Sequence, residues 1–313
     1  MVKTQPVESG SETLKEALNG YPGEVRFDEP MAPYTSLKIG GPAEAMVFPR
    51  SSAEVVLLME RIGQHRLPYF ILGGGSNLIV RDGGIPGVVV HLKHLSRFTF
   101  QEPDTLLADA GVSYPKLSTE AMARGLSGLE FAAGIPGTVG GAVAMNAGIP
   151  GEETASVLSS VTLVDEEAKV RTLPKEAISF GYRTAALPKG IVTSASFRLT
   201  PAAPAEVEQK LKRLLKRRRE TQPLSFPNVG SVFTNPQGDH AGRLVESVGL
   251  KGFRIGDAQI SELHGNFIIN LGNAKAAEVL ALIEEMRTRV KEQHGIDLEL
   301  EAKVVGKDKT REA

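Results

Sequence analysis

Two stretches of the sequence combine many glycines with no charged side chain. The first, ILGGGSNLIV, spans Ile71–Val80 and places Ser76 and Asn77 directly after Gly73–Gly75. Successive glycines can point their N–H groups inward and form a concave site for phosphate. A glycine turn in a hairpin explains the same residues equally well, so this stretch alone decides nothing.

The second stretch, AGIPGTVGGAVAMNAG, runs from Ala133 to Gly148. Its small side chains let a flat or elongated ligand approach the main chain, and Pro136 suits the first position of a short helix over Gly137–Met145. Tight packing of a helix on a sheet is the alternative. Neither stretch has the Walker A ending Gly-Lys-Ser/Thr, and Leu78 stands where a Rossmann fingerprint has its third glycine. Together the two stretches favour a shared dinucleotide ligand.

Three polar residues stand in settings that could also support chemistry. Arg183 follows Tyr182 in FGYRTAAL, Ser231 lies in NVGSVFTNP, and Glu301 lies in LELEA. A surface arginine, a turn serine and a solvent-facing strand acid are the simpler explanations. Glu299 and Glu301 would share one face of a strand, so that face is polar or reaches a site.

Several other chemistries are excluded or disfavoured. The 313 residues include no cysteine, which excludes disulfides and thiolate sites. The six histidines have no metal-binding spacing, so we expect no metal site. The basic run KLKRLLKRRR is interleaved with leucines and has no aromatic residue nearby, which favours a solvated helix face over a nucleic-acid site. With a net charge of −1, no signal-type N-terminus and no long apolar run, we expect an intracellular protein without a membrane partner.

The periodicity of apolar residues and the turn residues predict elements around these motifs. We expect helices at Ser11–Leu18, from Ser51 with Glu54 as a capping box, at Tyr114–Arg124, Ala205–Glu220, Ala241–Val248 and Ala274–His294, the last capped by Asn273 and ended by Gly295. We expect strands at Ala43–Pro49, on both sides of the first glycine loop up to Leu92, and at Phe98–Phe100, Thr105–Ala108, Leu129–Ala132, Ser159–Leu173 as a hairpin, Gly190–Pro201 as an edge or half-buried strand, and Ile296–Val305. A composition change places a domain boundary near Pro201.

Seven blocks of the sequence occur in the order typical of one enzyme family. They are YTSLKIGGPAEAMVFP, ILGGGSNLIVRDGGIPGVVV, GLSGLEFAAGIPGTVGGAVAMNAG, FGYR, VGSVFTNP, AGRLVESVGLKG and LELEAKVVG. They resemble the UDP-N-acetylenolpyruvoylglucosamine reductases (MurB), and the resemblance extends over roughly Tyr34–Gly306. An ordered set of blocks is far more specific than any single motif.

The resemblance implies an α+β fold with three domains. Two FAD-binding α+β domains of the type 2, PCMH-like kind would precede a C-terminal α+β substrate-binding domain. The implied boundaries are residues 1–20 for an N-terminal extension, 21–98 and 99–203 for the two FAD-binding subdomains, 204–305 for the substrate-binding domain with its closing strand, and 306–313 for a polar tail. The loop GGGSN has no histidine for a covalent link to flavin, so the resemblance implies non-covalent FAD.

The implied reaction is the NADPH-dependent, FAD-mediated reduction of UDP-N-acetylglucosamine enolpyruvate to UDP-N-acetylmuramate. It serves peptidoglycan precursor synthesis, and with it cell shape and cell division, in the cytoplasm. Ser231 would protonate substrate C2 while Arg183 and Glu301 stabilise the enolate, for which we expect a raised pKa at Glu301. Another FAD-dependent oxidase or dehydrogenase of the same fold is the alternative. A non-catalytic nucleotide-binding module is a weaker one.

The resemblance also assigns binding positions. The flavin-contacting blocks match Tyr34, Thr35, Gly73, Gly74, Gly75, Ser76, Asn77, Gly134, Ile135, Pro136, Gly137, Gly140 and Gly141. The substrate-binding positions match Tyr182, Arg218, Arg219, Asn235 and Gln259. Thr234 and Ala185 depart from the family pattern, and the chain resembles the short subgroup that lacks a tyrosine-bearing substrate loop. The sequence does not determine the oligomeric state, for which we expect a monomer.

Overall fold

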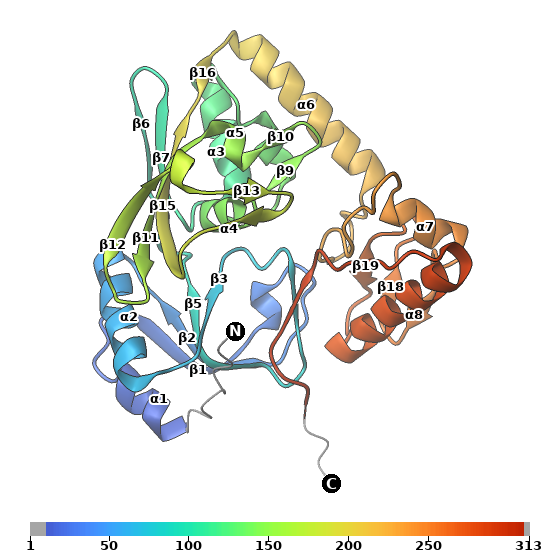
Figure 1. Cartoon of the computed structure of the whole chain (residues 1–313), viewed down its shortest axis with the longest axis horizontal. Coiled ribbons are helices and arrows are strands. Elements are labelled where there is room, and N and C mark those ends of the chain that lie inside the picture. Colours follow the sequence, from blue (N-terminus) through green and yellow to red (C-terminus); the bar gives the residue numbers. More distant parts are fainter. Residues whose placement is uncertain (1–10, 310–313) are drawn as a thin grey trace. The chain divides into compact units, whose positions relative to one another are not determined.

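The computed structural model describes residues 11–309, and the chain folds into two compact units (Figure 1). The first unit contains the chain up to Phe27, Glu44–Gly74 and Pro86–Lys216. The second contains Asp28–Ala43, Gly75–Ile85 and the chain from Arg217 onward. This grouping does not test the three-domain boundaries given above, which stay predictions. The loop expected at Met1–Ser9 lies outside the described residues.

The first unit is built on two sheets, although Asp28–Pro30, Pro42–Ala43 and Ile85, at strand ends of the smaller sheet, are assigned to the second unit. The smaller has the strand order β1-β2-β5-β3, with β3 parallel to β5, and its strands are β1 (Glu24–Pro30), β2 (Pro42–Phe48), β5 (Ile85–His91) and β3 (Tyr69–Leu72). The larger has the order β12-β11-β15-β7-β6 and is antiparallel throughout; its strands are β12 (Val170–Pro174), β11 (Leu158–Asp165), β15 (Gly190–Arg198), β7 (Thr105–Asp109) and β6 (Phe98–Gln101). The mixed content confirms the α+β prediction.

Helices and short strand pairs complete the first unit. The helices are α1 (Ser11–Leu18), α2 (Ser52–His65), α3 (Tyr114–Ala123), α4 (Val139–Ala144), α5 (Thr154–Val157) and α6 (Pro204–Thr221), whose last residues belong to the second unit. The strand pairs are β8 (Leu126–Ser127) with β16 (Thr200–Pro201), β9 (Gly148–Ile149) with β10 (Glu152–Glu153), and β13 (Phe180–Gly181) with β14 (Thr184–Ala185). The short 3-10 helices are η1 (Ala32–Tyr34), assigned to the second unit, η2 (Glu130–Gly134) and η3 (Lys175–Ala177).

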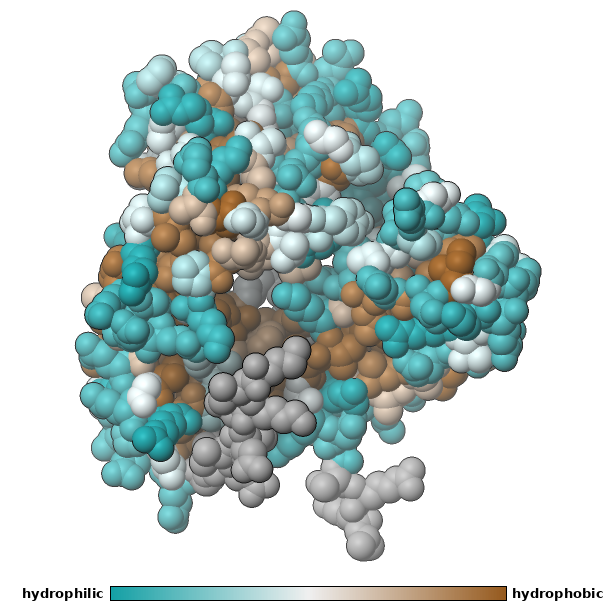
Figure 2. Space-filling view, viewed as in Figure 1, coloured by the Kyte–Doolittle hydropathy of each residue, from teal (hydrophilic) through white to brown (hydrophobic). Residues whose placement is uncertain are grey.

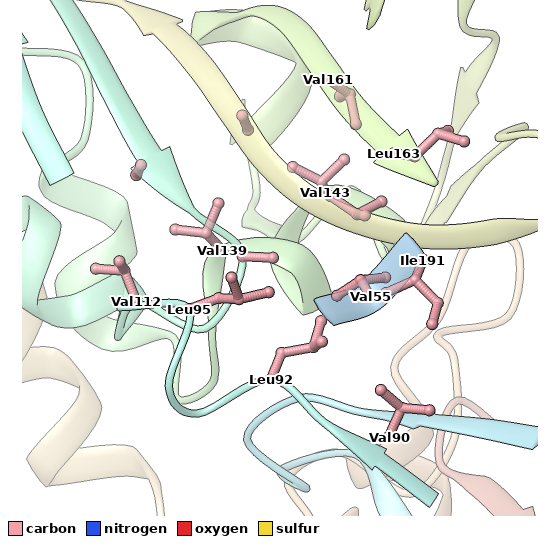
Figure 3. Close-up of a cluster of buried hydrophobic side chains, with 14 of the residues drawn as sticks. Val55, Val90, Leu92, Leu95, Val112, Val139, Val143, Val161, Leu163 and Ile191 are labelled. Carbon is pink, nitrogen blue, oxygen red and sulfur yellow. The ribbon is translucent and has the colours of Figure 1, made fainter. Parts of the chain in front are cut away.

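One apolar core extends through the first unit. Figure 3 shows Val139 and Val143 of α4 among its buried side chains, together with Leu92, Leu95 and Ile191. Val139 and Val143 stand four residues apart and therefore lie on one face of the short helix. Both are fully buried. The two valines therefore hold α4 in the apolar core, and the glycines of α4, Gly140 and Gly141, occupy positions between them.

The second unit has its own core around two small sheets. Its elements are β4 (Leu78–Val80), parallel to β20 (Lys303–Val305), the antiparallel set β17 (Arg254–Ile255), β18 (Ala258–Ile260) and β19 (Ile268–Asn270), and the helices α7 (Ala241–Ser247) and α8 (Ala276–His294). Val279, Ile283, Met286 and Val290 of α8 are buried in this core, as their spacing predicts. Gly295 ends the helix in the left-handed conformation with φ of 69°, also as predicted.

The start of α8 differs from the prediction. Asn273 does not cap the helix, whose N-cap is Lys275. The carboxylate of Asp82 instead accepts hydrogen bonds from the N–H groups of Ala276 and Ala277 at 2.9 and 3.0 Å. A carboxylate is favourable at the positive end of the helix dipole. A cap supplied from so far away in the sequence leaves no local signal.

Two predicted strands and one predicted helix start are wrong in their local structure. Residues Leu129–Ala132 do not form a strand, because the buried carboxylate of Glu130 accepts hydrogen bonds from Ser127 Oγ and Gly128 N at 2.6 and 2.9 Å and the chain turns into η2. Only Lys303–Val305 of the closing segment is a regular strand. The alternation of side chains along a strand therefore does not apply to Glu299 and Glu301, which were expected to share one face of it. Pro136 precedes α4, which begins at Val139.

The remaining helices and strands agree with the predictions within a few residues. Ser51 accepts a hydrogen bond from Glu54 N at 3.1 Å as the N-cap of α2, while the Glu54 carboxylate takes the N–H of Arg50. The strand β15 lies between β11 and β7, so it is central and not an edge strand. Figure 2 shows a largely hydrophilic surface over α6, in agreement with a solvated basic helix. Across residues 11–309, no helix combines the length and the apolar character needed to cross a bilayer.

Candidate functional site

The two glycine stretches meet in the first unit. A Cβ atom on Gly74 would lie 2.7 Å from the Cα atom of Gly137, and one on Gly73 would lie 2.8 Å from Thr138 Oγ1. Contacts this short do not occur for real Cβ atoms, and Gly74 requires glycine because the atom it would meet belongs to the main chain, whereas Gly73 would meet only the end of a threonine side chain. At Gly74 the reason is direct packing of one main chain on the other. At this contact two loop segments pack on each other, which differs from the packing of a helix on a sheet considered for the second stretch.

The hydroxyl of Thr138 lies beside Gly73 and Gly141. Its Oγ1 atom is buried and has no hydrogen-bond partner within residues 11–309. Gly73 and Gly141 both face this atom, with Cβ positions that would lie 2.8 and 3.7 Å from it. A buried hydroxyl without a partner is costly unless something else accepts its proton. A dinucleotide supplies such acceptors in its diphosphate, so the residues present fit FAD.

The segment that carries Thr138 is fixed by backbone pairing. Gly137 O accepts from Tyr114 N at 3.0 Å, Val139 N donates to Val112 O at 2.9 Å, and Gly140 N donates to Ala110 O at 2.8 Å. A Cβ on Gly140 would lie 3.0 Å from the Cβ of Ala110, so this glycine also serves packing. The main chain here is therefore rigid and closely supported on one side. Of the other predicted flavin contacts, Gly134 ends η2, Ile135 after it is partly exposed, and Pro136 is exposed.

The turn between β13 and β14 presents Tyr182 and Arg183. Arg183 has a φ of 56°, a conformation uncommon for a residue with a side chain. Its guanidinium lies 5.0 Å from the ring centroid of Tyr182, which is 61% exposed. Unusual backbone conformations concentrate at functional sites, because the surrounding structure must hold them. This turn belongs to the first unit.

Ser231 and Glu301 are brought together in the second unit. The backbone N–H of Glu301 donates to the carbonyl oxygen of Val232, the residue after Ser231, at 2.9 Å. Ser231 and Glu301 are both partly exposed. The side-chain amide of Asn77 donates to the carbonyl oxygen of Glu301 at 3.0 Å, and Asn77 O accepts from Lys303 N at 2.9 Å. Asn77, the last residue of the first glycine loop, therefore holds the main chain on both sides of Ala302.

The other predicted flavin contacts of the second unit surround Gly75. A Cβ on Gly75 would lie 2.0 Å from the carbonyl oxygen of Tyr34. Thr35 is buried, and its hydroxyl donates to Ile39 O at 3.0 Å. Ser36 N donates to Gly75 O at 3.1 Å, while its hydroxyl donates to Asn228 O at 2.7 Å. Ser76 follows with partial exposure.

The five predicted substrate contacts have different surroundings. Burial lowers the pKa of the Arg218 guanidinium, whose Nε donates to Gln222 Oε1 at 3.1 Å. No carboxylate of residues 11–309 forms an ion pair with it. Arg219 is exposed. The side chains of Asn235 and Gln259 form hydrogen bonds within the protein. Asn235 Oδ1 accepts from Ala241 N at 3.1 Å, and Gln259 Nε2 donates to Gly252 O at 3.0 Å.

Two residues near the glycine stretches have supporting contacts that the sequence does not reveal. Thr138 lies within the flavin-contacting block Gly134–Gly141, but a threonine among glycines gives no sign of an unpaired hydroxyl. Ser36 joins the first glycine loop to the loop of Ser231 through backbone acceptors separated by many residues in sequence. Only the fold brings those acceptors together, so the sequence contains no signal for this contact.

Comparison with known proteins identifies the class. A model described as the FAD binding domain matches residues 43–174. A model described as the UDP-N-acetylenolpyruvoylglucosamine reductase, C-terminal domain, matches residues 222–305. The matched segments contain both glycine stretches and the loop of Ser231. The protein is thus an FAD-dependent oxidoreductase.

Whole-chain relatives define the family within that class. The UDP-N-acetylenolpyruvoylglucosamine reductase of Syntrophus aciditrophicus is 43% identical over 302 residues, which cover 95% of this chain and 96% of that protein. UDP-N-acetylenolpyruvoylglucosamine reductase 2 of Symbiobacterium thermophilum is 44% identical, covering 91% and 93%. The crystal structure of the MurB reductase from Thermus caldophilus has a TM-score of 0.77 and 38% identity, covering 90% and 98%. The chain belongs to the UDP-N-acetylenolpyruvoylglucosamine reductase family, whose members use FAD and NADPH.

Proposed function

We propose that this enzyme reduces UDP-N-acetylglucosamine enolpyruvate to UDP-N-acetylmuramate with NADPH, using Ser231, Arg183 and Glu301. FAD, which the glycine stretches Gly73–Asn77 and Gly134–Gly141 would hold, would supply the hydride chemistry that links NADPH to C3 of the enolpyruvyl group. The protein provides the proton for C2 and the charges that stabilise the intermediate state. The observation that carries the proposal is the hydrogen bond of 2.9 Å from Glu301 N to the carbonyl oxygen of Val232, the residue that follows Ser231.

Ser231 donates the proton to C2. Addition of hydride at C3 leaves a strongly basic carbanion at C2, so a neutral hydroxyl held within about 3 Å is acidic enough to protonate it. The partial exposure of Ser231 leaves its side chain accessible to a substrate. The loop on both sides of Ser231 has its own hydrogen bonds: Gly230 N donates to Asn228 Oδ1 at 3.0 Å, and Val232 N donates to Asn266 O at 2.9 Å.

Arg183 and Glu301 stabilise the negative charge that spreads into the substrate carboxylate. Arg183 interacts with the developing enolate as a cation. Glu301 acts in its protonated form as a donor, because an ionised carboxylate would repel the enolate. Comparison of the pH–rate profiles of the wild type and Glu301→Gln tests this role. A profile and rate unchanged in Glu301→Gln would contradict it.

Arg218 binds the diphosphate of the sugar nucleotide. Its guanidinium is desolvated and lacks a carboxylate partner within the described residues, which favours an anionic ligand. The exposed Arg219 contributes less, because solvent screens its charge. Tyr182, Asn235 and Gln259 are secondary contacts in this proposal. The enzyme acts in the cytoplasm as a monomer, with small molecules as its only partners.

Anaerobic stopped-flow absorbance of the flavin separates the two half-reactions and tests the proposal. Ser231→Ala should leave reduction by NADPH nearly unchanged and slow reoxidation by the enolpyruvyl substrate by at least ~100-fold. Equal slowing of both half-reactions would contradict the role of Ser231. An oxidase of the same fold would instead be reoxidised by oxygen and not by the enolpyruvyl sugar nucleotide.

A further inference from the structure

The side chain of Asn266 pairs with the main chain beside Ser231. Asn266 is 3% exposed. Its Oδ1 accepts from Phe233 N at 2.9 Å, and its Nδ2 donates to Phe233 O at 2.8 Å. Its own carbonyl oxygen accepts from Val232 N at 2.9 Å. One residue therefore satisfies three backbone groups of the two residues that follow Ser231.

Those two residues in turn support Glu301. Val232 O accepts from the N–H groups of Glu301 and Ala302 at 2.9 and 3.2 Å. Phe233 forms an isolated antiparallel bridge with Leu300. Neither segment belongs to a regular strand at these positions, so no continuous ladder fixes their register. The side-chain amide of Asn266 pairs with Phe233 as the main chain of a neighbouring strand would, since it offers one donor and one acceptor side by side.

Asn266 is itself held by His264. The ring Nδ1 of His264 accepts from Asn266 N at 3.1 Å, which assigns the ring proton of the neutral form to Nε2. The ring packs on Phe267 with centroids 4.9 Å apart. A Cβ on Gly242 of α7 would lie 2.7 Å from the ring, so the small residue there makes room for it. The main chain of Asn266 is thus held by a hydrogen bond to a ring that is itself packed against its neighbours.

We propose that Asn266 is a positioning residue that fixes the separation of Ser231 and Glu301 through the backbone of Val232 and Phe233. It rests on the catalytic roles proposed above for Ser231 and Glu301. Asn266→Asp keeps the size of the side chain and replaces the donor to Phe233 O with an acceptor, so one end of the pairing is lost. A displacement of about 1 Å between reacting groups costs on the order of 100-fold in rate.

Asn270 offers a matched control from the same segment. It is 2% exposed, its Nδ2 donates to Leu37 O at 3.0 Å, and its Oδ1 accepts from Gly272 N and Ala274 N at 2.8 and 3.0 Å. Asn270→Asp therefore removes an equally buried amide donor without touching Val232 or Phe233. A loss that arises only from destabilisation of the second unit would appear in both variants.

The test measures the two flavin half-reactions in the FAD-loaded enzyme. Asn266→Asp should slow reoxidation by the enolpyruvyl substrate by at least ~30-fold relative to Asn270→Asp, with reduction by NADPH unchanged. In the double variant Ser231→Ala/Asn266→Asp, the rate should lie within about 3-fold of Ser231→Ala alone, because Asn266 acts through Ser231. Fully additive losses, or equal losses in Asn266→Asp and Asn270→Asp, would overturn the positioning role. A Ser231→Ala variant with normal reoxidation would instead overturn the proposed function.

Discussion

The side-chain amide of Asn146 donates a hydrogen bond of 3.1 Å to the carbonyl oxygen of Gly181, the residue before the turn that carries Tyr182 and Arg183. Asn146 is fully buried, lies at the end of the second glycine stretch with a φ of 39°, and accepts the N–H of Ala155 at 3.0 Å. One side chain therefore connects the glycine stretch to the turn of Arg183 inside the first unit. A change at Asn146 should alter both.

Asn146→Asp should destabilise the enzyme. The substitution keeps the acceptor for Ala155 N and removes the donor to Gly181 O, which leaves a carboxylate oxygen facing a carbonyl oxygen. We expect the free energy of unfolding to fall by about 1–3 kcal/mol. Urea denaturation of the FAD-loaded protein measures this loss. Asn235→Asp is the control, since an exposed aspartate can still accept the N–H of Ala241, and a loss of equal size there would contradict the interpretation.

Thr138→Val should separate stability from cofactor binding. Without FAD, the variant loses a buried hydroxyl that has no partner among the described residues, so the free energy of unfolding should stay the same or rise. With FAD, it loses a hydrogen bond, and the dissociation constant should rise by about 3- to 10-fold. Fluorescence titration of the apoprotein with FAD measures the affinity. An unchanged dissociation constant would show that the hydroxyl does not face the cofactor.

The elements that the sequence predicts well are those with local signals. The apolar periodicity of α8 and its terminal Gly295, and the serine cap of α2, depend on residues a few positions apart. Regular periodicity and end residues determine such helices largely by themselves. The same holds for the hairpin of β11 and β12.

Two of the wrong predictions concern side-chain carboxylates whose partners cannot be read from residue propensities, some distant and some only two or three residues away. The cap of α8 comes from Asp82, and the strand expected at Leu129–Ala132 is replaced by a turn around the carboxylate of Glu130, which also pairs with Lys210 at 3.5 Å. Burial alone would raise the pKa of Glu130, but the bonds from Ser127 and Gly128 and the charge of Lys210 hold it below its usual range. A buried ionised carboxylate with several partners is a tertiary feature, which residue propensities do not contain.

The residues of the candidate site also fall into those that the sequence indicates and those that only the fold reveals. The resemblance of the sequence blocks assigns roles to the glycine loops, Ser231 and Glu301, and these roles stay predictions. The supporting residues Ser36, Thr138 and Asn266 act through main-chain atoms or through an unpaired hydroxyl. Any sequence can supply main-chain acceptors, so only the fold distinguishes these positions.

The pair Arg218 and Arg219 tests the anion site with two neighbouring arginines. Arg218→Ala should raise KM for the sugar nucleotide by about 10- to 100-fold, the range expected for a charge-assisted hydrogen bond to phosphate. Arg219→Ala is the matched control and should change KM by less than about 3-fold, because its exposed charge is screened. Steady-state kinetics at fixed NADPH measures both values. Equal effects of the two substitutions would contradict the assignment of Arg218.

His91 should make the stability of the first unit depend on pH. Burial, with smaller effects from Lys93 and His94, lowers its pKa to about 4, although its ring Nδ1 lies 3.3 Å from Leu72 O. In the unfolded chain the pKa is about 6.5, so as pH falls the unfolded state binds the proton first. The free energy of unfolding should therefore fall between about pH 6.5 and pH 4, by up to about 3 kcal/mol, and level off below. His91→Gln should lose this dependence, while the control His65→Gln, at the end of α2, should keep it. Urea denaturation at stepped pH measures the free energy of unfolding of each protein. A difference in free energy between wild type and His91→Gln that stays constant from about pH 6.5 to pH 4 would refute the argument.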